Sequence, residues 1–161
     1  MKAKVIAVLV VAVFLGGLLT ASVARARIVE PMEQSIGLLR CELEMDVDWA
    51  NMKWDGTIAG DIEGSITVFE MPGVSFAGKT EHFHETFIIE TDSGSISGFD
   101  DGVWSFVNFK WVANGRVTAA TGSWAYLVGC NMRYSGTTTE FLGVGNPIHG
   151  IGTLMIMPRS H

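Results

Sequence analysis

Positively charged residues are scarce in this sequence of 161 residues. Lysine and arginine together number 11 against 17 aspartates and glutamates, which gives a net charge of −6. Without residues 1–26, which are interpreted below as a targeting segment, 8 basic residues face 17 acidic ones and the net charge is −9. Because the phosphates of nucleic acids are bound by basic surfaces, we expect no nucleic-acid partner.

The signatures of several common enzyme mechanisms are also missing. The chain has no Gly-x-Ser-x-Gly nucleophile elbow, no Walker loop and no dinucleotide-binding fingerprint. Adjacent carboxylates occur at Asp100-Asp101, but the glycine that follows them is typical of a turn. The sequence therefore establishes no enzyme, and its catalytic residues stay unknown.

Only one long apolar run is present, and it lies at the N-terminus. Lys2 and Lys4 precede an uncharged stretch over residues 5–19, and small residues follow up to Ala24. A positive start, an apolar run and an exit of small residues are typical of a secretory signal peptide. Residues 1–26 are therefore interpreted as a signal that is removed on export.

The alternative for this segment is an uncleaved membrane anchor, because about 20 residues are enough to cross a bilayer. The protein would then contact the membrane only through its N-terminal segment. Both interpretations predict a secreted or cell-envelope protein, outside the cytoplasmic membrane. Both also leave residues 27–161 as a single domain, which is long enough to bury a core of its own.

Cysteine is nearly absent, with Cys41 and Cys130 as the two examples. An even number of cysteines in an oxidising compartment makes a disulfide the first hypothesis. A bridge over so long a loop would stabilise the fold by roughly 3–5 kcal/mol in the chain-entropy model. The alternative is a pair of buried thiols on unrelated strands.

Strand patterns dominate the remainder of the chain. From Cys41 to Trp49, apolar residues alternate with four carboxylates, which predicts a strand with one buried and one solvated face. Turns are expected at Asp100–Gly102 and at Asn114-Gly115. Further strands are expected over residues 62–69, 81–90, 95–99, 103–113, 116–120, 124–134 and 150–157. Short strands separated by glycine turns indicate an all-β sandwich or barrel.

One segment carries a family resemblance. The run TAATGSW at residues 118–124, followed by LVG at 127–129, resembles allene oxide cyclase-like and dirigent-like barrels, in which a strand enters a Thr-Gly turn. The likeness extends over residues 58–157, but the family's Gly-Gly-Thr-Gly run is AATG here. The resemblance implies a closed antiparallel barrel of about eight strands with an apolar interior. It transfers no activity, because one fold serves many functions.

His82-Phe83-His84 is the short motif with the clearest chemical potential. His82, His84 and Glu90 share one side of the predicted strand, and His149 lies in a later strand. Imidazoles with a carboxylate bind divalent transition metals, and their order resembles that in cupins, although the spacing around His149 departs from that family. The alternative is that the aromatic face of this strand is buried and both histidines face solvent. We therefore expect no cofactor, with a divalent transition metal as the alternative.

Aromatic residues supply the other candidate site. In a barrel large enough to hold a ligand, they would line an apolar cavity in which few polar groups fix orientation. The candidate residues for this cavity are Trp104, Trp111, Trp124, Tyr126, Glu85 and Arg116. The alternative is an interior filled by its own side chains, as in many eight-stranded barrels.

Three functions follow from these patterns. The first is a non-catalytic barrel that binds a small apolar ligand or a protein partner, and it requires an interior cavity. The second is an enzyme of the cyclase or dirigent kind that guides a reactive intermediate, and it requires an ionisable group inside the barrel. The third is a cupin-like protein that binds metal through His82 and His84. Self-association into a homo-oligomer stays open for each.

Overall fold

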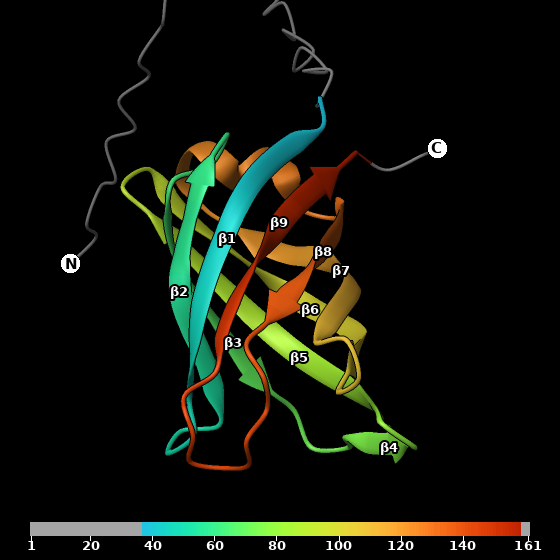
Figure 1. Ribbon diagram of the computed structural model, residues 1–161. Coiled ribbons are helices and arrows are strands. Elements are labelled where there is room, and N and C mark those ends of the chain that lie inside the picture. Colours follow the sequence, from blue (N-terminus) through green and yellow to red (C-terminus); the bar gives the residue numbers. More distant parts are fainter. Residues whose placement is uncertain (1–36, 159–161) are drawn as a thin grey trace, which may run out of the picture. The chain divides into compact units, whose positions relative to one another are not determined.

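The computed structural model describes residues 37–158, which form an antiparallel β-barrel (Figure 1). Its elements are β1 (Leu39–Asp48), β2 (Lys53–Gly60), β3 (Gly64–Glu70), β4 (Ser75–Ala77), β5 (Thr80–Thr91), β6 (Gly94–Ser105), β7 (Lys110–Ala120), the 3-10 helix η1 (Gly122–Leu127), β8 (Asn131–Thr138) and β9 (His149–Met157). Among these residues, no helix is long and apolar enough to span a membrane.

Eight strands close the barrel, and β4 is additional. The sheet runs β3-β2-β1-β9-β8-β7-β6-β5, and pairing between β3 and β5 joins its two ends. Where β3 ends, the short β4 takes over the same edge of β5. The predicted closed antiparallel barrel is thus confirmed. Residues 1–26, predicted as a signal or an anchor, lie outside the described residues.

Alternation of side chains decides which face of each strand forms the core. In β1, Cys41, Leu43 and Met45 are buried, whereas Glu42 and Glu44 are exposed. This is the pattern of a pleated strand with one face inside a barrel, and it confirms the strand predicted from the sequence. The other strands contribute buried apolar residues in the same way, including Ile89, Ile96, Val117 and Leu154.

Inward-facing glycines make room for large rings. Gly98 is the register partner of Phe87, and a Cβ at Gly98 would lie 2.7 Å from the tip of that ring. Gly102 has the same relation to Phe83, whose ring would overlap an added Cβ. The rings thus occupy space that the glycines leave empty, and the missing side chains let the sheet bend into a closed barrel.

Two predicted turns are wrong. Asp100–Gly102 lies within β6, Asn114-Gly115 lies within β7, and Asp100 is the register partner of Gly115. Gly115 is small for a packing reason, because a Cβ there would lie 2.6 Å from the Cβ of Asp100. The true connection between the strands is residues 106–109, in which Phe109 adopts a positive φ of 56°.

Two further differences concern individual elements. The prediction omits β2, whose sequence KWDGTIAG holds few large apolar residues. The strand predicted over residues 124–134 is wrong in its first half, where η1 forms a 3-10 helix and β8 begins only at Asn131. Leu127 of η1 is fully buried, so this helix covers one end of the barrel (Figure 1).

The predicted disulfide is absent, and strand order explains why. No bond joins Cys41 and Cys130, although both are buried. Cys41 lies on β1 opposite Leu154 of β9, whereas Cys130 immediately precedes β8, which pairs with the other edge of β9. Strands two places apart are about 10 Å apart, whereas a disulfide needs Cα atoms within about 7 Å.

Candidate functional site

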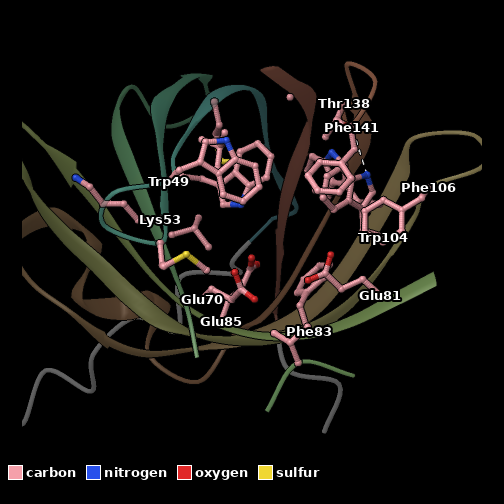
Figure 2. Close-up of a pocket in the computed structure, with 18 of the residues that line it drawn as sticks. Trp49, Lys53, Glu70, Glu81, Phe83, Glu85, Trp104, Phe106, Thr138 and Phe141 are labelled. Atoms are coloured by element: carbon pink, nitrogen blue, oxygen red, sulfur yellow. Dashed lines mark hydrogen bonds between the residues drawn. The ribbon is translucent and has the colours of Figure 1, made fainter. Parts of the chain in front are cut away.

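A cavity of about 410 Å³ lies inside the barrel, at the end opposite η1 (Figure 2). Its lining combines inward-facing strand residues with residues of all four connections at this end, represented by Trp49, Val74, Phe106 and Phe141. The connections therefore form a mouth, and the strands form the deeper walls.

Trp104 organises the aromatic wall of the cavity. It lies on β6, and its ring centroid is 4.7 Å from that of Phe106, 5.9 Å from Phe141 and 6.2 Å from Trp54. Its indole N–H donates a hydrogen bond of 3.1 Å to the hydroxyl of Thr138. The one polar group of this indole is thus satisfied by the protein, and the ring is free to present an apolar surface.

The deeper end of the cavity holds a buried carboxyl pair bridged by a tyrosine. Glu85 on β5 is the register partner of Asp100 on β6. The hydroxyl of Tyr134, on β8, lies 2.6 Å from Oε2 of Glu85 and 2.9 Å from Oδ1 of Asp100. All three side chains are buried, and Glu85 and Tyr134 line the cavity.

The local sequence of β7 explains how Tyr134 reaches β6. Strand β7 lies between β6 and β8, and its inward positions opposite the trio are Ala113 and Gly115. Neither residue carries a side chain beyond Cβ, so the phenol passes over β7 without obstruction. The ring of Trp111, 5.0 Å from that of Tyr134, packs against it from the mouth side of the same strand.

Burial and geometry favour an extra proton on the trio. A single phenol hydrogen cannot be donated to two carboxylates, and the remaining Asp100 oxygen has no hydrogen-bond partner among the described residues. Burial raises the pKa of Glu85 to about 8, and the charge of Asp100 acts in the same direction. Burial also raises the pKa of Asp100 to about 7. The deep end therefore presents a neutral carboxylic acid beside a phenol.

Two more carboxyl groups line the cavity. Glu70 on β3 is the register partner of Glu85, and Glu81 lies on the same inward side of β5. Burial raises the pKa of Glu81 to about 7, with a further contribution from the charge of Glu70. Burial also raises the pKa of Glu70. Lys53 is the one basic residue among the described lining, and its Nζ is 2.7 Å from Asp55.

The candidate cavity residues divide into two groups. Trp104, Trp111 and Glu85 line the cavity. Trp124 and Tyr126 belong to η1 at the other end of the barrel, where the Trp124 indole donates to the hydroxyl of Thr91 and Tyr126 is exposed. Arg116 has an exposed side chain on β7. The three residues of the first group occupy inward-facing strand positions, whereas the three residues of the second group do not.

The fold separates His149 from the two histidines of β5 in the metal hypothesis. His82, His84 and Glu90 are exposed on β5, and His84 pairs with Asp101. His149 lies on β9, four places from β5 in the sheet, with its Nδ1 2.9 Å from Asp46. Within residues 37–158, no group of three or more His, Cys, Asp or Glu side chains is placed to hold a metal ion.

Sequence reasoning missed Asp100, Tyr134, Glu70 and Glu81. One signal could have identified Glu81, because it shares strand parity with Phe83 and Glu85. Asp100 was hidden by its apparent turn, and Tyr134 by the absence of any local sign that it reaches across β7.

No protein-family model, curated protein or solved structure matches this chain.

Proposed function

We propose that this barrel binds a small, mainly apolar molecule in its interior. The observation that carries the proposal is the cavity of about 410 Å³ with its aromatic wall. Sites for small molecules are typically clefts of about 300–1,000 Å³, lined by apolar and aromatic side chains with a few polar groups. The cavity has this size and this composition.

Close packing is the alternative that the cavity argues against. Protein interiors are normally filled to the density of organic crystals, because side chains around a void lose dispersion contacts. A ligand in this cavity would restore to its lining the dispersion contacts that close packing normally provides. Apolar side chains also continue onto the surface beside the mouth, where Phe76, Leu142 and Val144 are 65%, 69% and 76% exposed. An apolar ligand would meet a favourable surface as it enters.

Gly150 offers a way to block the cavity and test the proposal. This residue lines the cavity, and a Cβ added there would meet no atom closer than 3.7 Å. We expect the neutral dye N-phenyl-1-naphthylamine to bind the wild-type protein at one saturable site, with an increase in fluorescence. Gly150→Leu should weaken this binding by about tenfold or more, because its side chain fills space that the dye needs.

Ile151→Phe is the matched control, since Ile151 is 55% exposed at the next position of the same strand. It adds volume outside the barrel and should bind the dye like the wild type. Circular dichroism would verify that each variant is folded. Equal dye affinity in the wild type and a folded Gly150→Leu variant would refute binding in this cavity.

A second candidate is an enzyme of the cyclase or dirigent kind, favoured by the Glu85–Tyr134–Asp100 trio. A carboxylic acid that stays neutral near pH 7, beside a phenol, can donate hydrogen bonds to an oxyanion that develops during a reaction. Glu85 and Tyr134 both line the cavity. An activity belongs to this trio if Tyr134→Phe abolishes it while binding of N-phenyl-1-naphthylamine is retained; an activity that survives the substitution refutes the assignment.

A further inference from the structure

We propose that the ligand of this cavity is an organic cation, with a positively charged nitrogen on an apolar body. The inference rests on the proposed function and specifies the chemical class of its ligand. The juxtaposition that supports it is an aromatic wall facing carboxyl groups that have no basic partner.

The first observation is an imbalance of charge. Glu70, Glu81 and Glu85 line the cavity. Within residues 37–158, no salt bridge reaches any of the three, because Lys53 pairs instead with Asp55 at 2.7 Å and with Asp48 at 4.0 Å. Buried carboxyl groups are normally paired with a cation, because an isolated charge in an apolar environment is costly. A cationic ligand would supply the missing partner.

The second observation is the position of the aromatic rings relative to these carboxyl groups. Figure 2 shows Trp104, Phe106 and Phe141 close together, with Glu70 and Glu85 below these rings in the view. The ring of Trp49 joins this wall, with its centroid 6.0 Å from that of Phe141. The face of an aromatic ring carries negative charge density and attracts a cation, most strongly where water is excluded. Rings and carboxyl groups therefore favour the same kind of ligand.

These two observations also discriminate against other ligands. An anion would be repelled by the carboxyl groups and would find Lys53 already paired. A metal ion needs several ligating atoms held together, and within residues 37–158 no such group of three is present. A neutral apolar molecule would fill the volume but would gain no charge attraction from the carboxyl groups. An organic cation would both fill the aromatic cavity and supply a partner for its carboxyl groups.

Protons and the ligand should compete for the same carboxyl groups. The titratable and charged groups that face one another at this site are Lys53 on β2, Glu70 on β3, Glu81 and Glu85 on β5, Asp100 on β6 and Tyr134 on β8. The acids keep protons at higher pH than usual. Binding of a cation should therefore release protons and strengthen as the pH rises from 5.5 to 8.

The experiment compares two probes of nearly identical shape. Benzyltrimethylammonium carries a permanent positive charge, and neopentylbenzene is its neutral isostere. We expect benzyltrimethylammonium to bind the wild-type protein at pH 8 about tenfold more tightly than neopentylbenzene, measured by the change in tryptophan fluorescence. Its affinity should fall about tenfold at pH 5.5, whereas that of neopentylbenzene should stay constant.

Substitution of the carboxyl groups tests whether they cause the preference for the cation. Glu81→Gln and Glu85→Gln should each weaken benzyltrimethylammonium binding at pH 8 by about fivefold or more and leave neopentylbenzene binding unchanged. Glu90→Gln is the matched control, because Glu90 is on the exposed side of the same strand, and it should change neither affinity. Glu81 is half-buried near the mouth, so Glu81→Gln remains informative if the deeper substitution disturbs folding.

The outcomes separate this inference from the proposed function. Neopentylbenzene binding as tightly as benzyltrimethylammonium would overturn the cation inference and leave the apolar site intact. Unchanged benzyltrimethylammonium binding in both Glu→Gln variants would also overturn it. Failure of both probes would overturn the cation inference, and failure of N-phenyl-1-naphthylamine as well would remove the proposed function.

Discussion

Lowering the pH from 8 to 5 should stabilise the folded barrel, and Glu85→Gln combined with Asp100→Asn should remove most of this gain. Burial raises the pKa of Glu85 to about 8 and that of Asp100 to about 7, above the ordinary values of the unfolded chain. Between the ordinary and the raised values, the folded state binds more protons than the unfolded state. Folding is therefore disfavoured as the pH rises through this window and favoured as it falls, by about 3 kcal/mol for each of the two carboxyl groups.

Urea unfolding at pH 5 and pH 8 would measure this effect. The double variant carries amides of the same shape that cannot ionise, so its stability should depend less on pH. The dependence that remains should come from Glu81 and Glu70, whose pKa values burial also raises. Glu90→Gln, on the exposed side of β5, should retain the wild-type dependence. The Lys53–Asp55 pair acts in the opposite direction, but only at lower pH, because hydrogen bonding to Lys53 lowers the pKa of Asp55. The same pH dependence in the double variant and the wild type would contradict the assignment of the buried pair.

Gly102→Ala should destabilise the barrel by about 2–3 kcal/mol, at the upper end of what overpacking costs. An added Cβ would overlap the ring of Phe83 and lie 2.7 Å from the carbonyl oxygen of Val112. Neither neighbour can move away easily, because Phe83 packs in the core and the Val112 carbonyl belongs to the backbone of the adjacent strand. Equilibrium unfolding in urea, with the slope compared between variants, would give the change in free energy.

Gly150→Ala is the matched control for this substitution. Its Cβ would meet no atom closer than 3.7 Å, so the change in stability should stay within about 0.5 kcal/mol. Combining Gly102→Ala with Phe83→Leu should recover part of the loss, because the smaller side chain leaves room for the methyl group. Similar losses for Gly102→Ala and Gly150→Ala would mean that the contact with Phe83 does not set the requirement for glycine.

Several strands of the barrel could be predicted because their sequence signals are local. The alternation in β1 and the aromatic parity of β5 follow from the two-residue repeat of a strand. Glycine led to the wrong turn predictions because it is favoured both in tight turns and where paired strands pack closely. At Gly115 it permits close packing inside a paired strand, whereas the same Asn-Gly dipeptide elsewhere permits a tight turn.

The candidate site was predicted only in part, for a related reason. Glu85 was identified as a polar residue of the cavity, but its partners come from two other strands. Asp100 meets it through the register of β5 and β6, and Tyr134 arrives over Ala113 from β8. Such a meeting depends on strand order and register, which a sequence pattern does not contain. The predicted disulfide was wrong for the same reason, because strand order places β9 between Cys41 and Cys130.

In the proposed binding site, two different parts of the chain would select the ligand. The carboxyl groups lie on paired strands, whereas Trp49, Phe106 and Phe141 lie in connections at the mouth. Connections tolerate changes in length and sequence that a closed sheet does not. Exchanging these connections would therefore change the shape of the molecule that is accepted, while the preference for its charge would stay with the barrel.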